Sequence, residues 1–166
     1  MTEISLKRAT ADDIPELVRL RNDVSETLAE RYGIGHWSAN VSDKGVVFSM
    51  KNGTVYVLKE SDVILATVTL SARKPWAIDT AYFSSAKRPV YLTAMAVAPT
   101  AQSKGIGRRC LEDVVQIAKG WPADAIRLDA YDAEAGAGEF YRKCGYTEMG
   151  RTIYRNTPLV YFEKLL

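Results

Sequence analysis

Apolar residues follow two different periods along this chain, and each period predicts a different kind of element. Short alternating or β-branched apolar stretches predict strands at 3–8, 54–59, 63–71, 90–98, 126–131, 145–150 and 158–165. Apolar residues spaced three and four apart predict helices over 12–30, 105–119 and 134–144, while 38–51 fits a short helix or a loop. Since no repeat or polar linker interrupts this order, we expect one mixed α+β domain over residues 1–166.

A short loop with two glycines, Gly105 and Gly107, joins the strand at 90–98 to the next helix. The start of a helix has unpaired backbone N–H groups and the positive end of the helix dipole, so it attracts phosphate. Glycine lets a ligand approach the backbone, and Lys104, Arg108 and Arg109 add positive charge there. The loop therefore predicts an anion site, most simply for a pyrophosphate. A tight turn without a ligand is the other interpretation.

Two common phosphate loops fit this segment poorly. No Lys-Ser/Thr pair follows Gly107, as a P-loop requires, and no third glycine completes a dinucleotide fingerprint. The pattern present is Gln102-x-x-Gly105-x-Gly107. It resembles the acyl-CoA signature of the GNAT superfamily of acetyl-CoA-dependent N-acetyltransferases.

A second segment resembles the same superfamily. It reads Glu134-x-x-Ala137-x-x-Phe140-Tyr141-x-x-x-Gly145-Tyr146. Helical spacing predicts that Ala137, Phe140 and Cys144 form the stripe that faces the sheet, with Tyr141 pointing elsewhere. Two positions depart from the family pattern. Glu134 replaces the usual asparagine, and strand 90–98 lacks the glutamate that often serves as general base.

The resemblance implies a GNAT-like acyl-CoA N-acyltransferase fold: a mixed, mostly antiparallel sheet of six to seven strands with flanking helices. It also implies acetyl-CoA as co-substrate, with pantetheine between strands 90–98 and 126–131. The backbone contacts to pantetheine fall on Met95, Ala96 and Val97. The pyrophosphate contacts fall on Gln102, Ser103, Lys104, Gly105, Ile106, Gly107 and Arg108.

The same resemblance and ordinary pKa values suggest catalytic roles. Tyr141 would be the general acid, because a tyrosine of pKa about 10 stays protonated where a thiol of pKa about 8.5 leaves. The candidate bases are His36, Glu30, Asp79 and Glu134, of which His36 has the most suitable intrinsic pKa. The aromatic side chains expected at the acceptor are Trp37, Trp76 and Tyr82, although a purely packing role fits them equally well.

Composition narrows the partners and the compartment. A net charge of +2 without a basic run excludes nucleic acid as an expected partner, and no apolar run of about 18 residues predicts a membrane span. The N-terminal residues do not resemble a signal peptide. Cys110 and Cys144 lack the spacing of metal ligands, so we expect no metal site. We expect both to be buried free thiols, which indicates a reducing compartment, the cytoplasm.

The expected function is transfer of an acetyl group from acetyl-CoA to a primary amine of a small or amino-acid-like molecule, with a homodimer as one option for the assembly. A CoA-binding sensor or regulatory domain without catalysis is the alternative. A nucleotide-binding domain is a weaker one, because the chain lacks a Walker lysine.

Overall fold

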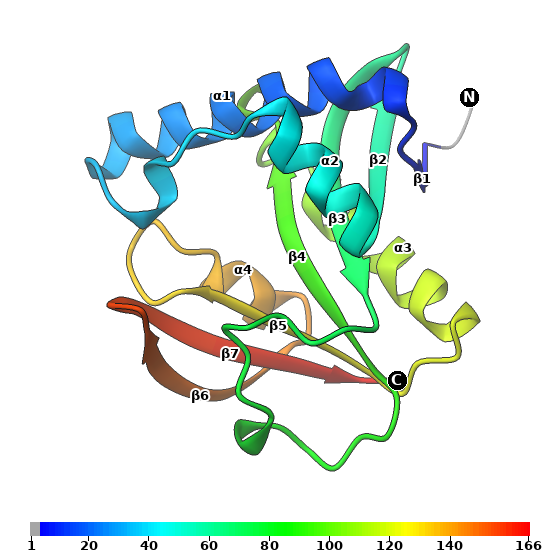
Figure 1. The fold of residues 1–166 in the computed structure, drawn as a ribbon, viewed down its shortest axis with the longest axis vertical. Helices are drawn as coiled ribbons and strands as arrows, with labels where there is room; N and C mark the ends of the chain where they lie inside the picture. Colours follow the sequence, from blue (N-terminus) through cyan, green and yellow to red (C-terminus); the bar gives the residue numbers. More distant parts are fainter. Residues whose placement is uncertain (1–3) are drawn as a thin grey trace. The chain divides into compact units, whose positions relative to one another are not determined.

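The computed structural model describes residues 4–166, and their contacts form two compact units. The first contains the chain up to Leu70 and Ala94–Val114, and the second contains Ser71–Thr93 and Val115–Leu166. The helices are α1 (Ile14–Tyr32), α2 (Asp43–Asn52), α3 (Ile106–Gly120) and α4 (Gly138–Lys143) (Figure 1). The strands are β1 (Leu6–Arg8), β2 (Thr54–Glu60), β3 (Val63–Ser71), β4 (Pro89–Val97), β5 (Ala125–Tyr131), β6 (Thr147–Tyr154) and β7 (Thr157–Leu165).

The hydrogen-bonded order of the strands is β1-β2-β3-β4-β5-β7-β6. The β1–β2, β2–β3, β5–β7 and β6–β7 ladders are antiparallel, and β4–β5 is parallel. This mixed, mostly antiparallel sheet of seven strands with flanking helices confirms the predicted fold class. The beginning of β4 belongs to the second unit and its end, from Ala94, to the first.

The core of the first unit lies between two helices and the sheet. Leu17 and Leu20 of α1 and Val46 of α2 pack against β2 and β3, where Val55 and Ile64 are buried. Figure 1 shows α1 and α2 on one side of β2 and β3. The other face of β3 presents Ala66, Val68 and Leu70, all fully buried, so side chains alternate between two covered faces.

The core of the second unit contains aromatic side chains and one buried ion pair. Ile78, Tyr91 and Tyr161 form a cluster against which Phe83 and Met149 pack. The connection between β3 and β4 supplies Ile78 and Phe83, so this long segment is attached to its own unit through buried side chains. It contains one short 3-10 turn, Thr80–Tyr82.

Most predicted elements are confirmed to within two residues. The helix predicted over 12–30 begins with a 3-10 turn, Ala11–Asp13, and the capping box at Thr10 and Asp13 is present. The segment 38–51, left open between helix and loop, contains α2. The strand predicted at 3–8 is observed as Leu6–Arg8, and its first residue lies outside the described part of the chain.

One predicted boundary is wrong, and one helix starts late for a reason that is present in the sequence. Within the segment 134–144 the helix spans only Gly138–Lys143 with Ala137 as its N-cap, as expected from Gly136 and Gly138, each of which costs a helix about 1 kcal/mol relative to alanine. The strand predicted at 145–150 is displaced and continues to Tyr154. It reaches that far because Arg155 and Asn156, both at positive φ, form a two-residue hairpin turn into β7.

Candidate active site

The end of β4 lies at the point where its pairing with β5 stops. The parallel ladder contains three pairs, from Pro89 with Ala125 to Tyr91 with Arg127. Three residues later, Ala94 has φ +51°, which interrupts regular strand geometry. The backbone of Met95, Ala96 and Val97 follows at once and includes no further pair with β5 within residues 4–166. An extended ligand could therefore hydrogen-bond to this stretch, as the sequence predicts.

The turn after β4 is held to the strand by a side chain of the predicted motif. Gln102 Nε2 donates to the carbonyl oxygen of Val97 at 3.0 Å. Ser103 has φ +62° and Gly105 has φ +81°, so the chain reverses here before α3 begins at Ile106. A Cβ on Gly105 would find no atom within 4 Å, which means that open space lies in front of this backbone.

The first turn of α3 faces the same open turn. An α-helix leaves its first backbone N–H groups without intrahelical partners, and α3 is a full 15 residues long. Lys104 and Arg108 are exposed beside it. The whole predicted set from Met95 to Arg108 lies in the first unit, in one continuous strand–turn–helix segment. Its chemistry fits the pyrophosphate of CoA.

Tyr141 is buried on α4, and its surroundings correct one prediction. Gly138 and Tyr141 form the buried face of the helix, whereas Ala137 is exposed and Phe140 and Cys144 are half-buried. The Tyr141 ring lies 5.9 Å from the ring of Phe162 and 5.7 Å from that of Tyr146. The predicted stripe was wrong because the helix is short and docks through its small residue, Gly138, which lets Phe162 approach.

The electrostatic surroundings of Tyr141 keep its hydroxyl protonated. Burial raises its pKa well above the usual value of a tyrosine, and the nearby carboxyl of Asp129 and the thiol of Cys144 raise it further. The hydroxyl is therefore neutral at any physiological pH and can donate a hydrogen bond.

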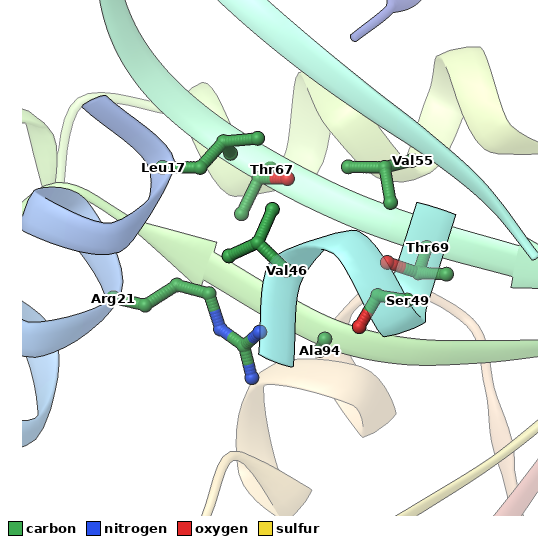
Figure 2. Close-up of a pocket in the computed structure, with 8 residues that line it drawn as sticks. All are labelled: Leu17, Arg21, Val46, Ser49, Val55, Thr67, Thr69 and Ala94. Atoms are coloured by element: carbon green, nitrogen blue, oxygen red, sulfur yellow. The ribbon is translucent and has the colours of Figure 1, made fainter. Parts of the chain in front are cut away.

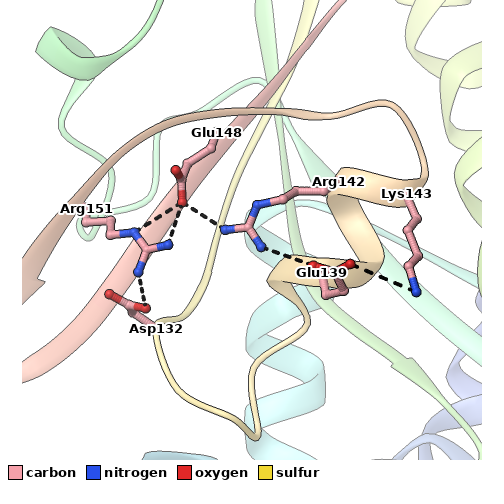
Figure 3. A network of polar contacts seen from close by, with 6 residues as sticks. All are labelled: Asp132, Glu139, Arg142, Lys143, Glu148 and Arg151. Atoms are coloured by element: carbon pink, nitrogen blue, oxygen red, sulfur yellow. Dashed lines mark hydrogen bonds and ion pairs between the residues drawn. The ribbon is translucent and has the colours of Figure 1, made fainter.

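An exposed ion-pair network ties α4 to the neighbouring strand β6 (Figure 3). Glu148 accepts from Arg142 at 2.9 Å and from Arg151 at 3.0 Å, and Arg151 also contacts Asp132 at 2.9 Å. The hydrogen bond from Arg142 lowers the pKa of Glu148, and the one from Arg151 lowers it further. This network connects the helix that carries Tyr141 to the β6–β7 hairpin.

The residues predicted at the acceptor lie in different places. His36 is exposed in the 3-10 turn His36–Ser38, and Trp37 Nε1 donates to the Gly33 carbonyl at 3.0 Å. Both belong to the first unit, whereas Trp76 and Tyr82 belong to the second. Trp76 is 88% exposed.

Tyr82 has a clear packing role. Its ring meets that of Tyr161 edge to face at 5.2 Å. It also lies so close to Gly150 that a Cβ there would approach the ring to 2.5 Å. The other candidate bases include Asp79, whose side chain accepts from the Ala81 N–H at 3.0 Å and thereby starts a short turn.

The structure adds one carboxyl that the sequence reasoning missed. Asp129 on β5 pairs with Tyr161 in the β5–β7 register, so their side chains lie on the same face. Burial raises the pKa of Asp129, and within residues 4–166 no hydrogen bond or ion pair reaches its carboxyl. The sequence contains a signal for this residue, because Arg127 and Asp129 are charged residues in an otherwise apolar strand. In the structure, Arg127 forms an ion pair with Glu163.

The thiols and the metal-ligating groups add no second site. Cys110 is buried, and burial raises its pKa to about 12, so it is unreactive at neutral pH. Cys144 is only half-buried, so the prediction of two buried thiols was wrong for this residue. Within residues 4–166, no group of three or more His, Cys, Asp or Glu side chains could hold a metal ion. In the same part of the chain, no helix is both long and apolar enough to cross a bilayer.

Known structures share this fold. The chain aligns with a ribosomal-protein-alanine N-acetyltransferase from Brucella melitensis over 97% of its length and 99% of the other chain, with 20% identity and a TM-score of 0.72. It aligns with an N-acetyltransferase from Staphylococcus aureus Mu50 over 99% of both chains, with 15% identity and a TM-score of 0.69. A protein of Salmonella typhimurium solved with its cofactor acetyl-CoA aligns over 99% of this chain and 95% of the other, with 15% identity and a TM-score of 0.70.

The family comparison is more specific than these similarities of fold. No curated protein matches the sequence significantly. The family model for the acetyltransferase (GNAT) family, in contrast, matches residues 17–146, which includes both segments that carry the predicted motifs. The chain therefore belongs to the GNAT acetyltransferase family.

Proposed function

We propose that this chain is an N-acetyltransferase that moves an acetyl group from acetyl-CoA to a primary amine of a small or amino-acid-like molecule. The observation that carries the proposal is the turn from Gln102 to Arg108, which is open in front of Gly105 and leads directly into α3. The family match spans parts of both compact units, which supports treating residues 1–166 as one domain. The two free cysteines are in keeping with a cytoplasmic location, which is also part of the proposal.

Binding of acetyl-CoA is assigned to the strand–turn–helix segment. The N–H groups at the start of α3, with Lys104 and Arg108, would hold the pyrophosphate. The backbone of Met95, Ala96 and Val97 would hydrogen-bond to the pantetheine arm and polarise the thioester carbonyl. When bound, acetyl-CoA supplies an acyl group that is already activated as a thioester.

Tyr141 is proposed as the proton donor to the departing sulfur. The proposal is supported by its place in the second motif and by a buried, protonated hydroxyl. A donor whose pKa lies above that of the thiol transfers its proton less readily. It still stabilises developing negative charge on sulfur through a strong hydrogen bond.

Two side chains are proposed as candidate general bases. The base must take a proton from an amine that is largely protonated at pH 7. His36 was predicted from its intrinsic pKa, and it is exposed. Asp129 is supported by its half-buried position and its raised pKa, because a more basic carboxylate accepts a proton from an ammonium group more readily. We rank Asp129 first, and the pH profile of kcat/KM separates the two candidates.

The proposal is tested by calorimetric titration of the protein with acetyl-CoA, CoA and ATP. Gly105→Asp should abolish binding of both CoA species, because it adds a side chain and a negative charge to the pyrophosphate site. Gly33→Asp is the matched control: Gly33 has φ +83° and also has open space around its Cβ position, but it caps α1. The control carries the same backbone strain and charge, and should bind normally.

Three other outcomes would change the conclusion. Tighter binding of ATP than of CoA would indicate a nucleotide site. Equal loss in both glycine variants would mean that the turn only matters for folding. The third is binding of acetyl-CoA without transfer to any amine of a broad panel, where transfer is monitored as release of the CoA thiol. This outcome would favour the CoA-binding sensor.

A further inference from the structure

A recess between α1, α2 and β3 in the first unit is too small for an organic ligand (Figure 2). Arg21, Ser49 and Thr69 supply polar groups to its lining. Its enclosed space of about 10 Å³ corresponds to about one water molecule. The charged residues along α3, in contrast, lie beside the turn that is assigned to acetyl-CoA.

Arg108 and Arg109 are neighbours near the start of α3, but their side chains have different surroundings. Arg108 is exposed beside the open turn. Arg109 is only partly exposed, and its Nε forms an ion pair with Oδ1 of Asp113 at 3.3 Å, four residues further along the helix. The sequence predicts that both arginines add positive charge to the pyrophosphate site. The structure instead places the charge of Arg109 against a carboxylate.

A third group holds the Asp113 carboxylate in place. Its Oδ2 accepts from the Leu6 N–H at 2.9 Å. Leu6 belongs to the edge strand β1, where it pairs with Leu58 of β2. The carboxylate is therefore held from two sides, by the backbone of β1 and by Arg109, and it is fixed to the sheet rather than free to follow the arginine.

The stability of α3 does not explain this ion pair. In an isolated helix, a pair of opposite charges four residues apart is more favourable when the acidic residue comes first, because that order suits the helix dipole. Here the basic residue, Arg109, comes first, and it lies close to the positive end of the dipole. The helix gains less from this order than from the reverse one, so a role outside the helix accounts better for the pair.

Distances along the helix axis show that Arg109 can reach in either direction. Ile106, the first residue of α3, is about 4.5 Å before Arg109, and Asp113 is about 6 Å beyond it. Long side chains on a helix lean toward its N-terminus, so a guanidinium released from Asp113 would lie beside the first turn. Asp113 itself is about 10 Å from Ile106 along the axis, a distance over which salt largely screens its direct repulsion of a phosphate.

We propose that Asp113 is a positioning residue that lowers the affinity for CoA by holding Arg109 away from the pyrophosphate. The inference rests on the proposed function, because it requires CoA to bind at the turn before α3. The pyrophosphate is common to acetyl-CoA and to the product CoA. A contact that strengthens both complexes equally lowers KM without raising kcat and slows the release of product. Asp113 thus favours the release of CoA.

The test is calorimetric titration of the protein, residues 1–166, with CoA. Asp113→Asn keeps an acceptor for the Leu6 N–H and removes the charge that holds Arg109. It should lower the Kd for CoA by about three- to tenfold, between the factor for an exposed ion pair and that for a hydrogen bond to a charged group. In turnover, KM for acetyl-CoA should fall and inhibition by CoA should become stronger, without a gain in kcat. A damaged fold would weaken binding, so this gain of affinity separates a positioning role from a structural one.

Arg109→Met identifies the group through which Asp113 acts. By itself it should leave the Kd for CoA almost unchanged, whereas Arg108→Met should weaken binding. In the Asp113→Asn/Arg109→Met double variant, the tightening should disappear. Glu112→Gln is the matched control, because it removes the same charge from the neighbouring, exposed position of α3. It should leave the Kd unchanged.

The outcomes separate this inference from the proposed function. Unchanged or weaker CoA binding by Asp113→Asn would overturn the inference while the proposed function stands. Equal tightening in Glu112→Gln, or tightening that persists in the double variant, would also overturn it, because net charge alone would then set the affinity. If the wild type binds no CoA, both are rejected. Binding of CoA without acetyl transfer rejects the transfer alone, and the titrations still decide about Asp113.

Discussion

The Arg127 side chain donates from Nε to Glu163 at 2.8 Å, and both side chains are almost completely buried, with 4% and 3% of their surface exposed. The pair also holds the connection before β4. Arg127 donates to the Ser84 carbonyl at 2.8 Å, and Glu163 accepts from the Ser84 N–H at 3.3 Å. Its guanidinium lies over the Phe83 ring, 5.0 Å from the centroid. One ion pair therefore joins β5, β7 and the long connection.

Removing one partner of this pair should be strongly destabilising. Arg127→Met leaves the Glu163 carboxylate buried without its partner, so we expect the free energy of unfolding in urea to fall by about 3–5 kcal/mol. The Arg127→Met/Glu163→Leu double variant should be less destabilised than the sum of the single variants. Arg151→Met at the exposed network should have a much smaller effect on the free energy of unfolding, because water screens exposed ion pairs. A similar small loss in Arg127→Met would contradict a structural role for the buried pair.

The carboxyl of Asp13, at the N-terminus of α1, should make the free energy of unfolding depend on pH in the acidic range. Burial by itself raises the pKa of Asp13, but hydrogen bonds from Lys59 and from the Thr10 N–H outweigh it, so the pKa is lowered in the folded state. A lowered pKa means that the folded state binds this proton less tightly than the unfolded state does. The stabilisation is therefore complete above the ordinary carboxyl pKa and is lost as the pH falls through the lower, folded-state value.

Asp13→Asn measures this contribution. We expect it to reduce the free energy of unfolding at pH 7 by about 1 kcal/mol, a modest value because Lys59 is 38% exposed. The difference from the wild type should shrink as the pH falls below about 4. Asp12→Asn in the same turn, where the side chain is exposed, should have little effect. A constant difference across this range would show that the charge of Asp13 is irrelevant.

The role of Tyr141 can be separated from its packing by a neighbouring tyrosine. Tyr141→Phe should lower kcat by about a hundredfold or more with unchanged affinity for acetyl-CoA, because it removes the proposed donor and keeps the ring. Tyr146 is the matched control, since its hydroxyl is buried and makes no hydrogen bond within residues 4–166. Tyr146→Phe should leave kcat unchanged and make the protein slightly more stable. Equal kcat values for both variants and the wild type would remove Tyr141 from the mechanism.

The two candidate bases predict different pH profiles. If Asp129 is the base, kcat/KM rises with pH through its raised pKa, and Asp129→Asn lowers kcat by about a hundredfold or more. Burial disfavours its charged form in the folded state, so ionised Asp129 reduces stability at neutral pH. Asp129→Asn should therefore increase the free energy of unfolding at pH 7 while reducing activity.

His36→Gln provides the comparison for this profile. It should leave the acidic limb of kcat/KM in place if Asp129 is the base. Loss of that limb in His36→Gln alone would assign the base to His36. A loss of both stability and activity in Asp129→Asn would instead indicate a structural role for the carboxyl.

The sequence by itself determined the order of elements and the family, and it predicted the loop proposed to bind the cofactor. These properties depend on local signals: apolar periodicity and glycines at fixed spacing before α3. Local signals also identified Tyr141 as the candidate general acid. They were insufficient for its orientation, because the buried face of a six-residue helix is set by what it docks against, here Phe162.

Only the tertiary structure decided which polar side chains are left without partners. Arg127 and Asp129 are the two charged residues of β5, yet Glu163, on a strand far away in sequence, forms an ion pair with Arg127 while Asp129 has none among the described residues. Thr67 and Thr69 look alike in β3, yet the Tyr56 carbonyl accepts only from Thr67. The pairing of strands that are far apart in the chain determines which side chains come into contact. For that reason the proposal of Asp129 as a base depends on contacts that no local pattern encodes.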